Sequence, residues 1–147
     1  MSPRTPRNPA GPVPRLTPLV LLVDDFRDAR EMYTEYLRAR GFNVEEAADG
    51  HEALAKARAL GPDVILMDLA LPGIDGWQVT RQLKRDARTR GITILALTAH
   101  AFKGEKERAL AAGCDGFIAK PCLPQEIADR LGRALAARDG DRKRRMR

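Results

Sequence analysis

The chain has 147 residues, a length that predicts one folded domain with a substantial hydrophobic core. Its net charge of +6 comes from 26 basic and 20 acidic residues, and the surplus sits at the two ends. Residues 1–18 hold three arginines and no acid, and residues 139–147 hold five basic and two acidic residues, which leaves 18 of each sign between them. No apolar run could span a bilayer or serve as the core of a secretory signal. We therefore expect a cytoplasmic protein whose Cys114 and Cys122 are small apolar side chains, because they fit no metal-binding spacing.

The predicted elements begin after a stretch rich in proline. Residues 1–18 contain six prolines, which oppose helix formation and strand pairing. From Leu19 onward, short apolar runs alternate with stretches in which apolar residues recur every three or four positions. The expected strands are 19–23, 42–47, 64–67, 92–97 and 117–119, and the expected helices are 29–37, 53–60, 76–86, 101–112 and 124–137. The chain is thus predicted to consist of a disordered leader (1–18), a folded domain (19–138) and a basic disordered tail (139–147).

Five alternating strand and helix units predict an α/β fold, with a parallel sheet covered by helices on both faces. Most of the strands are continuous apolar runs, as expected for strands that are buried on both sides. The strand at 42–47 contains Glu45 and Glu46 and is expected to lie at an edge of the sheet. In doubly wound sheets, ligands bind beyond the carboxyl ends of the strands. The residues that directly follow the strands are therefore the candidates for chemistry.

Four of the predicted strands lead into polar residues that could act together in one site. Asp24 and Asp25 follow the first strand, Asp68 the third, Thr98 the fourth and Lys120 the fifth. Three carboxylates in one crevice need a compensating cation, and ligands that are all oxygen favour Mg²⁺. Magnesium commonly shares its coordination with phosphate oxygens, and an aspartate can attack phosphorus to form an acyl phosphate. A lysine would offset the charge of the phosphoryl oxygens, and a hydroxyl would donate a hydrogen bond to one of them. No residue of the set remains as a general base, so the set favours accepting a phosphoryl group over rapid hydrolysis.

These motifs resemble, in order and spacing, those of the receiver domains of two-component response regulators. They are Asp24-Asp25, Asp68 before Leu-Pro-Gly-Ile-Asp-Gly, Thr98-Ala99 and Lys120-Pro121. The resemblance covers residues 19–137 and extends to the stand-alone, chemotaxis-type members of the family. It implies a flavodoxin-like fold, with five parallel strands in the order 2-1-3-4-5.

The resemblance also implies a phosphorylation switch. Asp68 would accept a phosphoryl group from a phosphohistidine on a sensor histidine kinase or a histidine phosphotransfer protein, and Thr98 and Lys120 would contact that group. Phe117 fits the aromatic switch position, whose ring turns inward when Thr98 moves toward the phosphate, although core packing would equally explain an aromatic residue there. The face formed by the fourth helix, the fifth strand and the fifth helix would then bind an unknown downstream protein, or the phosphate would pass onward in a relay.

The magnesium ligands implied by the resemblance are the carboxylates of Asp25 and Asp68 and the backbone carbonyl of Ala70, with Asp24 binding the ion directly or through water. Asp24 has the alternative role of capping the helix that follows it. Two positions depart from common choices in the family: Ala70 is small where many members carry a polar side chain, and His100 is an unusual occupant. Both positions flank the path of the hydrolytic water in this family. We therefore predict an altered phosphate lifetime, without a direction.

Two other functions remain open from the sequence. A phosphatase with an aspartate nucleophile, of the haloacid dehalogenase type, would need a second acid two residues after Asp68, where the chain has Ala70. A nucleic-acid-binding regulator would act through the basic ends, but the tail offers no aromatic side chain on which bases could stack. We expect a signalling switch, and not an enzyme beyond its own phosphotransfer and slow autodephosphorylation, with no nucleic-acid partner and no membrane insertion.

Overall fold

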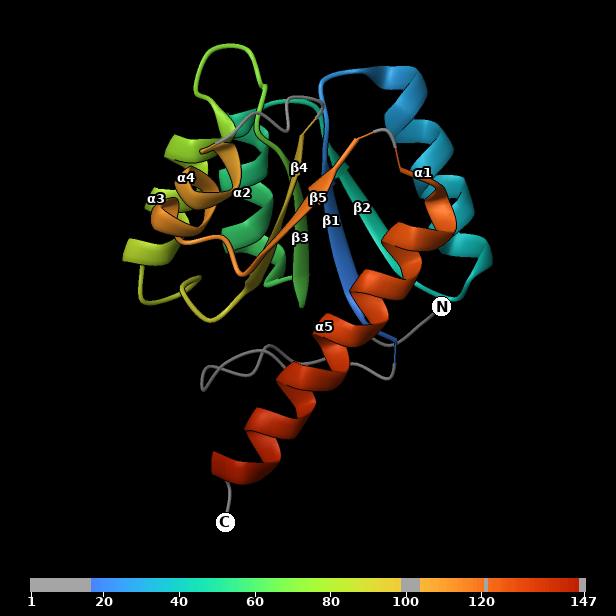
Figure 1. Ribbon diagram of the computed structural model, residues 1–147, viewed down its shortest axis with the longest axis vertical. Helices are drawn as coiled ribbons and strands as arrows, with labels where there is room; N and C mark the ends of the chain where they lie inside the picture. The colour runs from blue at the N-terminus through green and yellow to red at the C-terminus, as the bar shows by residue number, and fades with distance from the viewer. Residues whose placement is uncertain (1–16, 99–103, 121, 146–147) are drawn as a thin grey trace, which may run out of the picture.

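The structure, a computed structural model, describes residues 17–98, 104–120 and 122–145. Within these ranges strands and helices alternate along the chain (Figure 1). The strands are β1 (Leu19–Val23), β2 (Asn43–Ala47), β3 (Val64–Asp68), β4 (Thr93–Thr98) and β5 (Gly116–Ala119). The helices are α1 (Arg27–Ala39), α2 (Gly50–Leu60), α3 (Gly76–Arg85), α4 (Glu105–Ala112) and α5 (Pro124–Arg145). The predicted leader lies outside the described residues except for Thr17 and Pro18.

The strands form one parallel sheet in the order β2-β1-β3-β4-β5, which confirms the predicted fold class and strand order. β2 lies at an edge, as its two glutamates predicted, and its buried Val44 lies between exposed residues. The register places Asp68 opposite Leu97 and Thr98 opposite Ala119. The strand order reverses between β1 and β3, where doubly wound sheets bind their ligands. The residues that follow these two strands therefore lie side by side at the binding edge.

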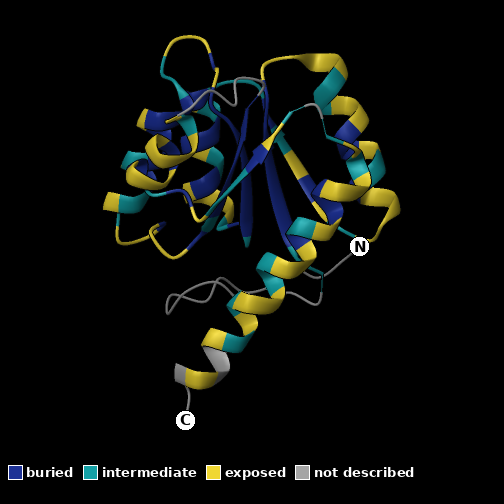
Figure 2. Cartoon of the chain, in the orientation of Figure 1, coloured by how far each residue is buried: buried dark blue, intermediate teal, exposed yellow. Residues whose placement is uncertain are grey.

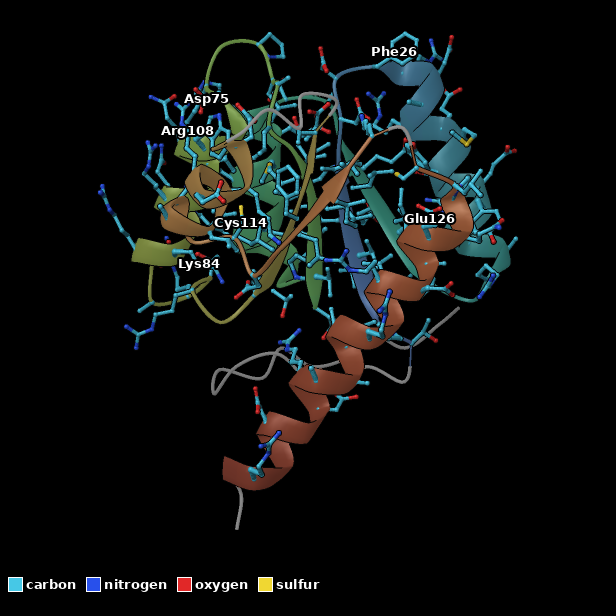
Figure 3. All side chains as sticks on the ribbon, in the orientation of Figure 1. Phe26, Asp75, Lys84, Arg108, Cys114 and Glu126 are labelled. Carbon is cyan, nitrogen blue, oxygen red and sulfur yellow. The ribbon has the colours of Figure 1, made fainter. Side chains whose placement is uncertain are left out.

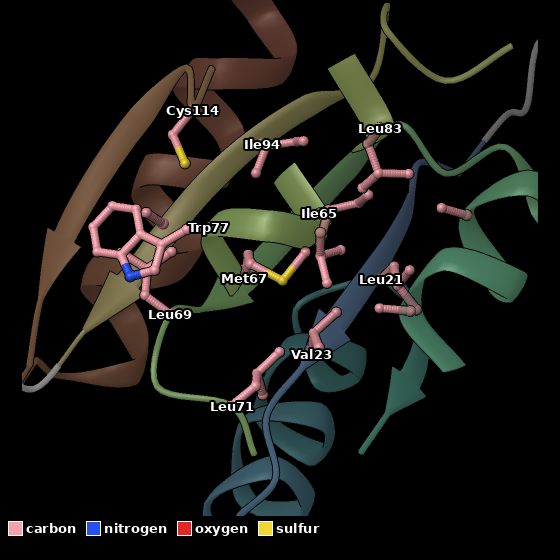
Figure 4. Close-up of a cluster of buried hydrophobic side chains, with 14 of the residues drawn as sticks. Leu21, Val23, Ile65, Met67, Leu69, Leu71, Trp77, Leu83, Ile94 and Cys114 are labelled. Atoms are coloured by element: carbon pink, nitrogen blue, oxygen red, sulfur yellow. The ribbon is translucent and has the colours of Figure 1, made fainter. Parts of the chain in front are cut away.

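Helices cover both faces of the sheet (Figure 1). On one face, Leu37 of α1 and Leu131 of α5 belong to a buried apolar cluster that also contains alternate residues of the central strands. On the other face, α2, α3 and α4 enclose a second cluster, in which Trp77, Leu83 and Cys114 are buried (Figure 4). Burial on both faces explains why the central strands are continuously apolar (Figure 2). Both cysteines are free thiols, Cys114 buried and Cys122 half-buried, as predicted.

The start of α3 is fixed against the end of β3. The Asp75 side chain caps the helix by accepting a hydrogen bond from the N–H of Gln78 at 2.9 Å. At Gly76, a Cβ atom would lie 2.6 Å from the carbonyl oxygen of Asp68, so the close approach requires glycine. This contact anchors one end of the loop that contains Ala70, next to the carboxyl end of β3.

The last helix is longer than predicted. α5 continues to Arg145, which corrects the expected disordered tail for residues 139–145. Gly140 does not end the helix, because a glycine inside a helix costs only about 1 kcal/mol. Arginine, which recurs along this part of α5, is a good helix former, and Arg144 pairs with Asp141 at 3.3 Å within the helix. The C-terminal turns project past the sheet (Figure 1). Among the described residues, no helix is both long and apolar enough to cross a bilayer.

Candidate functional site

Three aspartates meet at the carboxyl end of the sheet. Asp24 and Asp25 follow β1, and Asp68 is the last residue of β3. Each offers a carboxylate oxygen, and the three oxygens lie within 4.8 Å of one another. Asp24 is completely buried, Asp68 is buried with 7% of its surface exposed, and Asp25 lies at the rim. The structure therefore brings together the three carboxylates that the sequence suggested as metal ligands.

Asp24 is held by hydrogen bonds through both its backbone and its side chain. Its N–H donates to the carbonyl of Ala47 on β2 at 3.1 Å, and its Oδ1 accepts from the N–H of Phe26 at 2.9 Å. Phe26 precedes α1, and its own ring is exposed at this end of the molecule (Figure 3). Asp24 thus orders the loop before α1, and no side chain caps the first turn of that helix. Its other oxygen, Oδ2, remains directed toward Lys120 at 3.3 Å.

Asp68 is an acid in an environment that disfavours its charge. Burial is the main cause that raises the pKa of Asp68 above its ordinary value, and the negative charges of Asp24 and Asp25 add to this. Two contacts act in the opposite direction: the N–H of Ala70 donates to Oδ1 at 2.9 Å, and the Nζ of Lys120 lies 3.7 Å from Oδ2. These contacts do not offset burial completely. In the protein alone, these two contacts therefore only partly stabilise the negative charge of Asp68.

One ammonium group lies beside the carboxylate cluster and pairs with two of its three members. The Nζ atom of Lys120 lies between Asp24 and Asp68, and its side chain is 20% exposed. With one positive and three negative charges, the cluster has a net formal charge of −2 when all three acids are ionised. Closely spaced hard oxygen donors with a surplus of negative charge fit Mg²⁺, which prefers one or two carboxylates together with water and phosphate oxygens. The donor set therefore fits the metal that the sequence suggested.

Thr98 and Phe117 come from the two neighbouring strands. Thr98 ends β4 and is buried, and its carbonyl accepts a hydrogen bond from the backbone N–H of Lys120 at 2.7 Å. This bond joins the two strand ends on which the sequence placed the phosphate-binding hydroxyl and ammonium. Phe117 is half-buried on β5 and packs against the cluster beneath α2, α3 and α4. Its place fits both core packing and the predicted switch, and the switching role stays a prediction.

The two positions expected to tune the phosphate lifetime differ in what the structure describes. Ala70 is exposed, and its N–H is engaged with Asp68. Its methyl side chain adds no polar group beside the acceptor aspartate, while the metal-binding role of its carbonyl stays a prediction. His100 lies outside the described residues.

Arg30 belongs to this site although the sequence analysis did not identify it. Its Nη1 donates to the backbone carbonyl of Asp24 at 2.8 Å, and its Nε donates to Oε1 of Glu46 at 3.1 Å. Its partners belong to the loop after β1 and to β2, so no local sequence pattern marks the contact. The only signal is an arginine shortly after an acidic pair, which by itself suggests a solvated helix face.

Comparisons with known proteins agree with this geometry. The model of the response regulator receiver domain matches residues 20–132. The polar-differentiation response regulator DivK of Brucella ovis is 39% identical over 106 residues, which is 72% of this chain and 86% of that protein. The chemotaxis protein CheY4 of Vibrio cholerae superposes with a TM-score of 0.76 at 34% identity, covering 80% of this chain and 98% of that one.

A third relative contains the metal. The receiver domain of the sensor histidine kinase PA1611 of Pseudomonas aeruginosa has a TM-score of 0.76 at 35% identity, and covers 82% of this chain and 98% of its own. That structure holds a magnesium ion coordinated in its active-site cleft. The family model spans most of this chain, and its relatives share both the sheet and the sequence. The chain therefore belongs to the response regulator receiver domain family.

Proposed function

We propose that this receiver domain accepts a phosphoryl group on Asp68 from a phosphohistidine of a sensor histidine kinase or histidine phosphotransfer protein. The observation that carries the proposal is the charge imbalance around Asp68, where oxygens of three carboxylates lie within 4.8 Å of one another and one lysine pairs with two of them. Such a site would be stabilised by a divalent cation, which would also offset the negative charge of an incoming phosphoryl group. The receiver family membership supports the same chemistry.

The residues of the site would divide the work of transfer. The Oδ1 atom of Asp68 is held by the N–H of Ala70, which leaves Oδ2, on the side of Lys120, to attack phosphorus. The new O–P bond forms as the N–P bond of the phosphohistidine breaks, and its electron pair returns to the imidazole. Lys120 would offset charge on the phosphoryl oxygens, and the Thr98 hydroxyl would donate a hydrogen bond to one of them.

Magnesium would be held by Asp24, Asp25, Asp68 and the carbonyl of Ala70. When bound, it would neutralise the negative charge that the acids and the transferring phosphoryl group bring together.

Phosphorylation would be read at the face made by α4, β5 and α5. Movement of Thr98 toward the phosphate would free space for the ring of Phe117, which already packs beneath α4. Leu110 on α4 and Leu123 just before α5 are large apolar side chains that are 46% and 54% exposed. They would give a downstream protein an apolar contact on this face. The same aspartyl phosphate could instead be passed to a histidine in a phosphorelay.

The signalling role is favoured over that of a phosphatase. An aspartate-nucleophile phosphatase needs an acid two residues after its nucleophile, and that position is Ala70. We propose that this domain dephosphorylates itself slowly, at a rate set in part by Ala70 and His100. Phosphate release that is unchanged in both Ala70→Asn and His100→Ala would contradict that tuning.

Labelling with a small phosphodonor tests the proposed function. With acetyl phosphate and Mg²⁺, the wild-type protein should gain one phosphoryl group by intact mass spectrometry, and Asp68→Ala should gain none. Asp75→Ala is the matched control, because this aspartate lies in the same loop but caps α3, and it should be labelled like the wild type. Labelling of Asp68→Ala, or rapid turnover of a generic phosphate ester by the wild type, would overturn the proposal.

A further inference from the structure

Arg30 links three elements beside the acidic cluster. It extends from α1, and its guanidinium bridges the carbonyl of Asp24, 2.8 Å from Nη1, and the carboxylate of Glu46, 3.1 Å from Nε. Its side chain is only 15% exposed. Arg27, one turn earlier on the same helix, is 78% exposed and pairs with Glu31, also on α1. The two arginines therefore differ in surroundings, and only Arg30 reaches the loop that contains the acidic pair.

The bond to Asp24 fixes the peptide group that leads into Asp25. The N–H of Asp24 is already tied to Ala47 on β2 at 3.1 Å, so the arginine adds a second anchor on the carbonyl side. The carboxylate of Asp25 makes no hydrogen bond to another described residue. Its position near Asp24 and Asp68 therefore depends on the direction in which the backbone presents it.

We propose that Arg30 is a positioning residue that holds Asp25 within reach of the metal, an inference that rests on the proposed Mg²⁺ site. Two effects of the guanidinium oppose each other. Its positive charge disfavours a nearby cation, whereas its hydrogen bond keeps the acidic loop in a metal-binding arrangement. Glu46 neutralises the charge at 3.1 Å, so positioning dominates. Loss of a residue that orients a metal ligand weakens metal binding by about 10- to 100-fold.

The test is magnesium affinity measured by calorimetric titration of the full chain. We expect Arg30→Gln to weaken Mg²⁺ binding on the order of tenfold. Arg30→Lys, which keeps the charge and one donor toward Asp24, should recover part of this loss. Arg27→Gln is the matched control on the same helix and should bind Mg²⁺ within about twofold of the wild type, because it contacts no residue of the acidic loop.

A second measurement separates positioning from general stability. In metal-free protein, exchange of the Asp25 and Phe26 amide hydrogens should become faster in Arg30→Gln and stay unchanged in Arg27→Gln. A purely structural role would lower the unfolding midpoint without changing the Mg²⁺ affinity of the folded protein, which contradicts the inference. Equal or tighter Mg²⁺ binding by Arg30→Gln would also overturn it. If the wild type itself binds no Mg²⁺, the proposed function fails, and this inference fails with it.

Discussion

The two ends of the parallel sheet differ in how their acidic side chains are paired with cations. At the amino end, Asp63 and Asp115 each have a cation and a backbone N–H as partners: Asp63 pairs with Arg138 at 3.2 Å and accepts from the N–H of Leu19 at 2.8 Å. Asp115 likewise pairs with Lys84 at 2.9 Å. At the carboxyl end, three acids lie close together, and Lys120 pairs with two of them, Asp24 and Asp68. We call the amino end matched, because Asp63 and Asp115 have cations of their own. The carboxyl end has a surplus of negative charge, which favours the binding of a cation.

This difference separates charges that stabilise the fold from charges that serve function. A charge with a partner and a satisfied hydrogen bond contributes stability, whereas uncompensated acids close together reduce it. Both ends are rich in aspartate, so the number of acids does not distinguish them. The ratio of acids to available cations does, and it can be tested by removing one carboxylate at a time.

The largest effect is expected from breaking the matched end at Asp63. Asp63→Ala removes the acceptor for the N–H of Leu19 and the carboxylate that pairs with Arg138, at a site where both side chains are less than one-fifth exposed. We expect the free energy of unfolding in urea to fall by about 2–3 kcal/mol. Magnesium-dependent labelling of the folded protein should persist. Loss of labelling without loss of stability would contradict the separation of the two ends.

A smaller loss is expected at Asp115. Its Oδ2 accepts from Lys84 and, at 2.8 Å, from the N–H of Ile94 at the start of β4. The side chain is 46% exposed, so water replaces part of what is lost. We expect Asp115→Ala to lower the free energy of unfolding by about 1 kcal/mol. An effect as large as that of Asp63→Ala would show that exposure does not weaken this pair.

At the surplus end, removal of an acid should stabilise the metal-free protein. The pKa of Asp68 is raised in the folded state, so the folded protein is favoured while this carboxyl is protonated. This contribution is present below the ordinary carboxyl pKa and is lost as the pH rises through the raised value. At neutral pH without Mg²⁺, Asp68→Asn should therefore be more stable than the wild type, on the order of 1 kcal/mol.

The pH dependence supplies the check on Asp68→Asn. In urea titrations, the advantage of the variant should shrink as the pH falls into the ordinary carboxyl range, where the wild-type carboxyl is protonated too. Added Mg²⁺ should stabilise the wild type more than the variant, because the variant lacks one carboxylate ligand. A variant that is less stable than the wild type at neutral pH would mean that Asp68 is compensated, and the comparison between the ends would fail.

The fold was predictable where local pattern and burial coincide. Strands such as Val64–Asp68 lie between helices on both faces, so their composition alone marks them. The strand order came from the family resemblance, because an apolar run does not encode which strand will lie beside it. The glutamates of β2 were the exception, since charged residues in a strand indicate an edge.

The site was predictable to the extent that it follows the strand ends. Asp24, Asp68 and Lys120 directly follow or end strands, and a parallel sheet places such residues at one edge. Arg30 was not predictable, because its contact with Glu46 joins residues 16 positions apart on a helix and an edge strand. The degree of burial was also hidden: nothing in the sequence indicates that Asp24 is fully enclosed while its neighbour Asp25 is exposed.

The smallest effect is expected from removing residues 139–147. Among the described side chains, Arg138 is the last of α5 to hydrogen-bond to the body of the domain, through Asp63, and the Arg144 contacts lie within the helix itself. Truncation after Arg138 should therefore change the free energy of unfolding by less than about 0.5 kcal/mol, the usual range for surface changes. Helix content by circular dichroism should fall, while labelling of Asp68 should not.

The truncation is informative because Asp141 lines a 630 Å³ cavity together with Arg88 and Arg90, at the same end of the sheet as Asp63. If the projecting turns of α5 were part of the matched charge network, their removal would leave these arginines less compensated and lower stability by more than 1 kcal/mol. A small change in the free energy of unfolding would instead show that the matched end consists of the pairs made by Asp63 and Asp115, without the last turns of α5. It would also set the boundary of the stable domain at Arg138, although the helix itself continues beyond it.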